Sequence, residues 1–464
     1  MAVPVIVIFD AGKTNKKMLL FDEQYDLLYE ESVTLAETED EDGFACENVD
    51  ALTGWVKQKF EEVTANNKYD VHAVNFSGYG ASFVNLGHDL KPVTPLYNYL
   101  KPYPEYLKKQ FYDTYGGESL IAKQTASPVL GNLNSGMQLY RLKYEKREVF
   151  NTIKYSLHLP QYLAFVLTGQ AFADITSIGC HTQLWDYREN KYHEWVVKEG
   201  IDKLFGPVFP GDKTIPVKDK NIVSGIGLHD SSAALVPYLA SVKQPFILLS
   251  TGTWCISLNP FNHSLLSDYE LHQDCLNYIT YRGKPVKASR LFAGYEHEQQ
   301  VKRLAAHFNR HPDYYKSVVY DARQLNGLHR AAGAHQTGTG TAMVEQSGFD
   351  KRALQSFKTY EEAYHQLIYG IIIQQVRSLK LVLNHSPVNQ VFVDGGFGNN
   401  NVYMNMLASS LPHIKIFAAI VGQASALGAA LAIHESWNSR PAPENLISLK
   451  YYAPAEEIEG RRSL

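Results

Sequence analysis

Asp230 stands where a carboxylate could act as a general base. It follows the turn from Gly225 to His229 and opens a run of small residues, Ser231 to Leu235, that has helical character. A general base needs to reach the proton that it removes, and a turn at the start of a helix gives a side chain that reach. Aspartate is also a preferred helix cap, and this alternative stays open for Asp230. The neighbouring His229 is either a ligand contact or a structural histidine.

A second candidate follows an apolar strand near the N-terminus, in the run Asp10-Ala11-Gly12-Lys13-Thr14-Asn15-Lys16-Lys17. Gly12 lets the backbone approach an anion, Thr14 and Asn15 offer donors, and the lysines, Lys13 and Lys17 among them, offer charge. Asp10, at the strand end, could hold Mg²⁺. A hairpin turn that contains Gly and Asn, with solvated lysines, is the alternative.

Two further turns in the second half of the chain have residues suited to a nucleotide. In Ser250-Thr251-Gly252-Thr253 a glycine lies between two threonine hydroxyls, which suits phosphate oxygens, although Ser and Thr beside Gly are also ordinary turn residues. In Asp394-Gly395-Gly396-Phe397-Gly398-Asn399-Asn400, consecutive glycines precede a helix and could lie under an adenosine. Asn399 or Asn400 is also a candidate cap for that helix.

A wall for a sugar is predicted from two segments that combine small, aromatic and amide residues. They are Phe76 to Phe83, with Gly80, Ala81 and Ser82, and Pro95 to Tyr99, with Asn98 and Tyr99. Hydroxyl, amide and aromatic groups are typical of small-molecule sites. His181 is a further candidate, with a core or capping histidine as the alternative.

The elements that position these residues fall into two similar series. Apolar strands at Val5–Phe9, Met18–Phe21 and Tyr25–Leu35 precede a helix at 49–63 and a strand at 71–76. The order restarts with strands at 246–249 and 255–258, a helix at 360–383 and a strand at 391–393. We therefore expect a mixed α/β protein with two copies of one topology, divided into residues 1–240 and 241–464, and a ligand cleft between the domains.

Composition excludes several classes of protein. The chain has 48 acidic residues and 44 Lys and Arg, which give a net charge of −4. A chain without an excess of positive charge is not expected to bind nucleic acid. The four cysteines are far apart, which predicts free thiols without a zinc site. The N-terminal apolar run is too short for a membrane span and lacks signal-peptide features, so we expect a cytoplasmic protein without a membrane partner. The stretch Tyr97 to Tyr106 is a candidate contact for a homodimer.

In their order and spacing, across nearly the whole chain, these motifs resemble those of the FGGY carbohydrate kinases. Phe9 to Asn15 is similar to the family's first phosphate loop, Ser250 to Trp254 to its second, Asp394 to Asn400 to its adenosine motif, and Gly422 to Ala430 to its closing helix. The resemblance implies two ribonuclease H-like domains, as in actin and heat-shock chaperones, and the use of ATP and Mg²⁺. It also implies that Asp230 accepts the proton of a sugar hydroxyl and that Asp10 helps to place the metal.

Within the family, His229 to Ala233 resembles the catalytic-base motif of the rhamnulokinase and L-fuculokinase branch. This implies phosphorylation of a ketose or deoxyketose of the L-rhamnulose or L-fuculose type. Lys13, Gly78 to Ser82 and Tyr97 to Tyr99 depart from the pattern of other members. A kinase for xylulose, ribulose, glycerol or an aminosugar is therefore an alternative. A different class, an ATP-gated binding or regulatory protein without transfer, is another.

Overall fold

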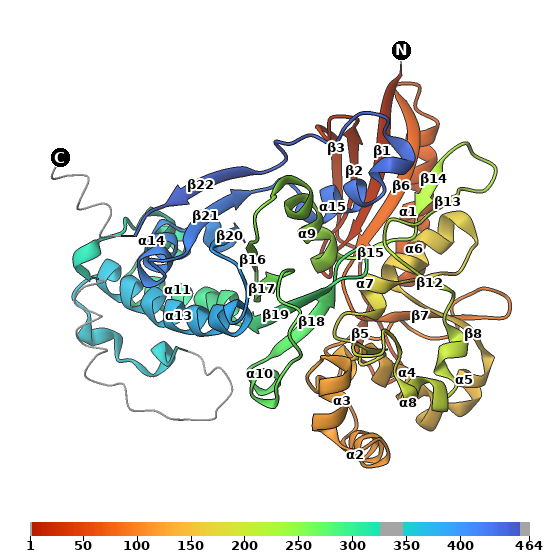
Figure 1. The fold of residues 1–464 in the computed structure, drawn as a ribbon, viewed down its shortest axis with the longest axis horizontal. Helices are drawn as coiled ribbons and strands as arrows, with labels where there is room; N and C mark the ends of the chain where they lie inside the picture. The colour runs from red at the N-terminus through yellow and green to blue at the C-terminus, as the bar shows by residue number, and fades with distance from the viewer. Residues whose placement is uncertain (1, 325–346, 455–464) are drawn as a thin grey trace. The chain divides into compact units, whose positions relative to one another are not determined.

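A computed structural model describes residues 2–324 and 347–454. The chain forms two compact units (Figure 1). The first contains Met1–Ser241, Leu276–Pro285 and Gly422–Leu446, and the second contains Val242–Cys275, Val286–Val421 and Ile447–Leu464. Two late segments of the chain therefore belong to the unit built from the N-terminal half. The roles predicted for domains 1–240 and 241–464 stay predictions.

The central sheet of the first unit has the strand order β3-β2-β1-β6-β14-β13. The hairpins β1–β2 and β2–β3 are antiparallel, β6 is parallel to both β1 and β14, and β13 is antiparallel to β14. The strands are β1 (Val3–Ala11), β2 (Lys16–Asp22), β3 (Leu27–Val33), β6 (Tyr69–Gly78), β13 (Thr214–Pro216) and β14 (Val223–Gly225). A short strand, β15 (Leu228–His229), also pairs with β6.

The second unit repeats this arrangement in the order β19-β17-β16-β20-β21-β22. Again two antiparallel pairs precede two parallel pairs, and the last strand is antiparallel. The predicted duplication is therefore confirmed. The strands are β16 (Ile247–Thr251), β17 (Cys255–Asn259), β19 (Pro285–Leu291), β20 (Gln390–Gly395), β21 (Lys415–Ile420) and β22 (Ser448–Tyr452), and β18 spans Cys275–Ile279.

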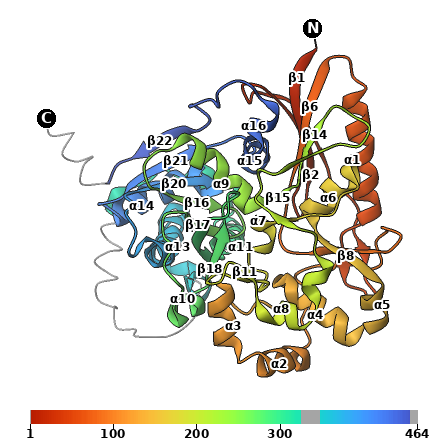
Figure 2. The same ribbon diagram turned by 45° about the vertical axis from the view of Figure 1, so that its right-hand side comes forward.

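Burial on both faces explains the continuous apolar run of β1. Val5, Val7 and Phe9 pack into one hydrophobic core with the helices α1 (Val49–Thr64) and α6 (Leu159–Thr168). Because side chains alternate along a strand, Ile6 and Ile8 face the other side, where α15 (Ala424–Ala432) contacts β1 and β6. Figure 2 shows α1 and α15 on opposite sides of these strands.

Small residues bring α15 close to α9 (Asp230–Ser241) on that second face. A Cβ at Gly428 would lie 1.8 Å from the carbonyl oxygen of Ala233, so this crossing requires glycine. The Gly and Ala content of both segments is thus explained by close helix packing. The packing also fixes the direction in which α9 leaves its first residue, Asp230.

Outer elements complete the first unit. Its other helices are α2 (Glu105–Thr114), α3 (Glu118–Thr125), α4 (Ser135–Glu145), α5 (Arg147–Thr152), α7 (Ile175–Ile178), α8 (Glu194–Lys198) and α16 (His434–Trp437). Its short strands are β4 (Thr38–Glu39), β5 (Ala45–Cys46), β7 (Phe83–Gly87), β8 (Ile153–His158), β9 (Ala173–Asp174), β10 (Trp185–Asp186), β11 (Lys191–Tyr192) and β12 (Val208–Phe209).

In the second unit, one face of the sheet is covered by three long helices whose apolar residues share a core with Ile247 and Leu249 of β16. They are α11 (Ala293–His307), α13 (Tyr360–Leu383) and α14 (Asn401–Ser410), and a short helix, α10 (Asp268–His272), precedes β18. Helix α13 has the predicted bounds, because its apolar periodicity is long and strong.

Two expectations from composition can be compared with the fold. All four cysteines are buried and free, as predicted. Among the helices of residues 2–324 and 347–454, none is long and apolar enough to cross a lipid bilayer. The stretch Tyr97 to Tyr106 is exposed only in part, since Tyr97 is buried whereas Leu100 and Tyr106 are exposed.

Candidate active site

The sheet register brings Asp10 and Asp230 to one edge of the first unit. In β6, Ser77 pairs with Asp10 of β1 on one side and with Leu228 of β15 on the other. Asp230 lies two residues beyond Leu228, at the first position of α9. Strand ends at this edge therefore deliver both carboxylates to the same place, although they are far apart in the sequence.

The carboxylate of Asp230 is held on one side and open on the other. Its Oδ1 accepts hydrogen bonds from the Ser231 amide at 2.5 Å and from the Ser231 hydroxyl at 3.2 Å, and lies 3.4 Å from His229 Nε2. Within the part of the chain that the structure describes, Oδ2 makes no hydrogen bond, and the side chain is 35 % exposed. Asp230 thus has a fixed orientation and a free oxygen, as a base requires.

Asp10 is enclosed more deeply. Its Oδ2 accepts a hydrogen bond from Ser425 Oγ of α15 at 2.8 Å. The pKa of Asp10 is raised from 3.8 to about 6, chiefly by burial and also by the charge of Asp230, against the opposing effects of Ser425 and Lys17. The two carboxylates therefore repel each other in a site that would favour a cation between them.

Aromatic rings lie beside the Oδ1 side of Asp230. The His229 ring stacks on Tyr278 with centroids 5.5 Å apart and lies 5.9 Å from the His181 ring. Burial lowers the pKa of His229 against the opposing charge of Asp230, so the imidazole is neutral at neutral pH. Burial and then the charge of Asp230 raise the pKa of Tyr99, whose ring lies 5.9 Å from that of Tyr79, the neighbour of Gly80.

Gly80 belongs to this group for a steric reason. A Cβ at this position would lie 2.5 Å from Cδ2 of His229, closer than side chains tolerate. The predicted substrate residues Gly80, Tyr99, His181 and His229 are therefore brought together around Asp230. They form a partly aromatic group beside the carboxylate, in which His181 and His229 are buried.

Ala81, Ser82 and Asn98, in contrast, are engaged within the scaffold. The Ser82 hydroxyl donates to the Tyr97 carbonyl at 2.8 Å, and the Ala81 carbonyl accepts from Gln138 Nε2 at 3.0 Å. Asn98 Nδ2 donates to the Ala45 carbonyl at 3.1 Å. The first contact joins the two predicted wall segments, and the other two tie these segments to Gln138 of α4 and to Ala45 of β5.

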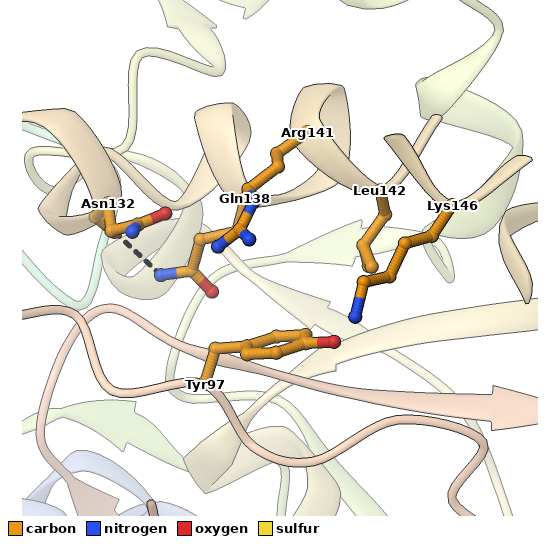
Figure 3. Close-up of a pocket in the computed structure, with 6 residues that line it drawn as sticks. All are labelled: Tyr97, Asn132, Gln138, Arg141, Leu142 and Lys146. Carbon is orange, nitrogen blue, oxygen red and sulfur yellow. Dashed lines mark hydrogen bonds between the residues drawn. The ribbon is translucent and has the colours of Figure 1, made fainter. Parts of the chain in front are cut away.

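A small recess adjoins the predicted wall segment Pro95 to Tyr99 at Tyr97 (Figure 3). It is lined by Tyr97, Asn132, Gln138, Arg141, Leu142 and Lys146. Gln138 Nε2 donates to the Asn132 carbonyl at 2.6 Å across it. Asp10, Asp230 and the aromatic group around Asp230 are not among its lining residues, so the recess is separate from the carboxylate pair.

The predicted first phosphate loop is the four-residue connection of the β1–β2 hairpin. Thr14 is exposed, and the Asn15 amide oxygen accepts from Thr34 Oγ1 at 3.0 Å. Lys13 pairs with Glu37 at 2.8 Å and Lys17 with Glu30 at 3.0 Å. Both lysines remain partly exposed, so they could exchange these partners for a phosphate group.

In the second unit, Thr251 joins the other two predicted nucleotide motifs. Its hydroxyl donates to the Asp394 carbonyl at 2.5 Å and accepts from the Phe397 amide at 3.0 Å. Gly395 has φ +87°, and a Cβ there would lie 2.1 Å from the Thr251 carbonyl oxygen. Thr251 thus organises the turn, whereas Gly252 and Thr253 remain exposed for a ligand.

In the predicted adenosine motif, too, some residues hold the turn together and others are exposed. Asn400 caps α14, since its Oδ1 accepts from the Tyr403 amide at 3.1 Å, and its Nδ2 donates to the Tyr364 hydroxyl at 2.6 Å. The capping alternative is therefore correct for Asn400. Gly395, Gly396 and Asn399 are exposed at the end of β20 and in the short helix η6 (Gly396–Asn399).

Sequence reasoning missed the residues that support the carboxylates. Besides Ser77, Ser425 and Tyr278, a buried chain runs from Asp174 to the residue before the base. The Thr176 hydroxyl donates to Asp174 Oδ1 and accepts from the His229 amide at 2.9 Å. Burial raises the pKa of Asp174 to about 7. Ser425 and Ser77 had a signal in the sequence, because they lie in the segments Gly422 to Ala430 and Phe76 to Phe83.

Sequence comparison identifies both halves of the chain. The FGGY family of carbohydrate kinases, N-terminal domain, matches residues 5–230, and the carbohydrate kinase FGGY, C-terminal domain, matches residues 243–441. A rhamnulokinase of Halalkalibacterium halodurans is 24 % identical over 240 residues, which are 47 % of this chain and 48 % of the relative. A rhamnulokinase of Bacillus subtilis is 20 % identical over 364 residues, 68 % and 69 % of the two chains. The match thus spans about half the length of the first relative.

Solved structures share the fold over almost the whole chain. A xylulose kinase and a gluconate kinase, both from Lactobacillus acidophilus, each have a TM-score of 0.80 at 17 % identity and cover 99 % and 100 % of this chain and 96 % of theirs. A Plasmodium falciparum glycerol kinase with ADP has a TM-score of 0.71 at 15 % identity, with 100 % and 96 % covered. The expected pair of ribonuclease H-like domains is confirmed.

Proposed function

The chain belongs to the FGGY family of carbohydrate kinases, and we propose on this premise that it transfers the γ-phosphoryl group of ATP to a hydroxyl of a small sugar. The observation that carries the proposal is the paired setting of Asp230 and Asp10 at one sheet edge. One carboxylate has a free oxygen beside a partly aromatic group, and the other is enclosed. This asymmetry suits a proton acceptor and a cation holder.

Asp230 is proposed to take the proton of the attacking hydroxyl through Oδ2. Ser231 and His229 hold Oδ1, so the carboxylate does not need to reorient when the substrate arrives. Phosphoryl transfer needs little covalent chemistry from the protein and depends on positioning and on charge stabilisation. The first loop would hold phosphate oxygens with backbone amides, Lys13, Lys17, Thr14 and Asn15. Thr253 and the glycines 252, 395 and 396 would hold the nucleotide in the second unit.

Mg²⁺ fits the residues that are present. In the described part of the chain, no cluster of three or more His, Cys, Asp or Glu side chains could hold a metal by protein ligands alone. Magnesium is usually held by one or two carboxylates together with water and substrate phosphates, which is what Asp10 offers. The ion would supply charge neutralisation on the phosphates and would remove the repulsion between Asp10 and Asp230. Asp10 is therefore proposed to hold it in the ATP complex.

For the acceptor, we favour a ketose or deoxyketose of the L-rhamnulose or L-fuculose type. The two rhamnulokinase relatives and the motif His229 to Ala233 support this choice. The group of Gly80, Tyr99, His181 and His229, which contains no carboxylate or lysine, suits an uncharged sugar with an apolar face. Xylulose, ribulose, glycerol and an aminosugar stay as alternatives, since the solved structures with this fold carry several substrate names.

An activity panel tests the choice of substrate. Purified protein with ATP and Mg²⁺ is offered L-rhamnulose, L-fuculose, L-xylulose, D-xylulose, L-ribulose and glycerol, and ADP formation is followed. The highest kcat/KM is expected for one of the first two sugars. A higher value for a pentulose or glycerol would move the assignment to that acceptor.

A function of another class, an ATP-gated binding protein without transfer, is tested by the same panel. A clamp needs no proton acceptor beside the ligand, and the free oxygen of Asp230 argues against this class. Nucleotide binding without ADP formation on any sugar would favour it. A cytoplasmic location and a homodimer stay predictions, which cell fractionation and light scattering can check.

A further inference from the structure

A buried ion pair lies directly beneath the first phosphate loop. Lys16 Nζ is 2.8 Å from Glu47 Oε2, and both side chains are 3 % exposed. Lys16 differs in this from its neighbours Lys13 and Lys17, which are paired near the surface. A buried pair of this kind contributes little net stability relative to apolar residues, so its position calls for another explanation.

The other contacts of Lys16 are made to the loop itself. Nζ donates to the Gly12 carbonyl at 3.1 Å and to the Lys13 carbonyl at 3.2 Å. Together with Glu47, these partners use all three donors of the ammonium group. The lysine therefore draws two successive loop carbonyls inward.

The opposite sides of these two peptide groups must face outward. In a trans peptide the N–H points away from the C=O, so the amides of Lys13 and Thr14 point away from Lys16. Within residues 2–324 and 347–454, neither amide donates a hydrogen bond. Successive backbone amides that point to one side form an anion-binding nest.

Glu47 anchors this arrangement to the rigid part of the unit. It directly precedes Asn48, the N-cap of α1, and its backbone bridges to Leu96. Its carboxylate also accepts a hydrogen bond from the Tyr79 hydroxyl at 3.4 Å. Because Glu47 lies at the start of α1, which packs against the sheet, its carboxylate holds Lys16 in a fixed position.

We infer that Lys16 and Glu47 are positioning residues that hold the amides of Lys13 and Thr14 toward the nucleotide phosphates. This inference rests on the proposed function, because it takes the nucleotide as the ligand of the loop. It assigns to Lys16 no contact with ATP. Lys16 acts through the backbone of the loop. Removal of the Lys16–Glu47 pair should therefore weaken nucleotide binding and leave sugar binding unchanged.

The test compares the wild type with the double variant Lys16→Met/Glu47→Gln, which leaves no buried charge without a partner. The Kd of ADP is measured by calorimetry, and the KM values of ATP and of the sugar are measured by ADP release. The double variant should fold but bind ADP about tenfold or more weakly, as expected when hydrogen bonds from a charged donor are lost. The KM of the sugar should stay within about twofold of the wild type, because the hydrogen bonds of Lys16 and Glu47 go to Gly12, Lys13 and Tyr79 and not to Asp230 or the residues grouped around it.

A second variant and a matched control complete the design. Glu47→Asp keeps both charges but withdraws the carboxylate from Lys16, and a smaller loss of ADP affinity is expected at a nearly unchanged melting temperature. Lys143→Met/Glu199→Gln removes another partly buried pair, at 2.6 Å, far along the chain from the loop, and should leave ADP binding unchanged. Equal ADP affinity in the wild type, the double variant and Glu47→Asp would overturn the inference, as would an equal loss in the control.

The wild-type measurement separates this inference from the proposed function. Wild-type protein that binds no adenine nucleotide would overturn the proposed function and the inference with it. Wild-type protein that binds ADP and phosphorylates a sugar, beside a double variant with unchanged ADP affinity, would overturn the inference alone.

Discussion

Asp10 and Asp230 meet at one edge of the first sheet, where burial and then the charge of Asp230 raise the pKa of Asp10 to about 6. The two carboxylates share a neighbour, since Ser77 of β6 lies between β1, which carries Asp10, and β15, which leads to Asp230. Their surroundings nevertheless differ, because Asp10 is enclosed whereas Asp230 keeps one oxygen free. The difference in environment assigns them different parts in a single reaction.

The raised pKa of Asp10 predicts how the free protein responds to pH. The folded value of about 6 exceeds the ordinary 3.8, so between these values the unfolded chain loses the proton first. Stability should therefore fall as the pH rises through this window and stay lower above it. Asp10→Asn removes this effect, so its urea midpoint relative to the wild type should increase from about pH 4 to about pH 7. A constant difference across that range would contradict the shift.

Removal of divalent metal should abolish activity, and Asp10 should set the concentration that restores it. Chelation followed by titration with Mg²⁺ gives this concentration directly. Asp10→Asn should require about tenfold or more Mg²⁺ for half-maximal rate, because a carboxylate ligand is replaced by a weaker amide oxygen. An identical titration curve in both proteins would show that Asp10 does not hold the ion.

Thr176 is expected to position the base from behind. Thr176→Val keeps the shape of the side chain but leaves the buried His229 amide without its acceptor. We expect kcat to fall about tenfold, while the KM of ATP changes little. The control is Thr182→Val, since Thr182 is buried in the same segment and bonds to the Ile178 carbonyl. Equal loss in both variants would point to a general effect on folding.

Gly395 provides a steric test of the nucleotide turn. Gly395→Ala would bring a Cβ to 2.1 Å from the Thr251 carbonyl, so the turn must shift and the KM of ATP should rise about tenfold or more. Gly283→Ala is a matched control, because Gly283 has a similar φ of +84° but no atom within 4 Å of an added Cβ. If the two variants had the same KM for ATP, the turn would not be part of the nucleotide site.

Local patterns were sufficient to predict the central hairpins and the longest helices of the two units. The hairpin of β1 and β2 follows from short apolar runs around a Gly and Asn turn, and α13 follows from its long apolar periodicity. Asp230 was placed correctly at the start of α9, because small residues after a turn indicate a helix. Such features depend on neighbours in the sequence.

Contacts between distant segments account for what was missed. The return of residues 422–446 to the first unit places Ser425 beside Asp10, a pairing that no local pattern encodes. Lys16 had a usable signal, because it alternates with Met18 and Leu20, which face the core. That alternation separates Lys16 from Lys17, although the three lysines of the loop look alike in the sequence.

The most direct test is the rate of sugar phosphorylation by Asp230→Asn with the best substrate of the panel. The variant keeps the shape of the side chain, and circular dichroism and ADP affinity should match the wild type. We predict a fall in kcat of about 10²- to 10⁴-fold, the usual contribution of a general base. A folded Asp230→Asn variant that phosphorylates the sugar at the wild-type rate would contradict the assignment of Asp230 as the base.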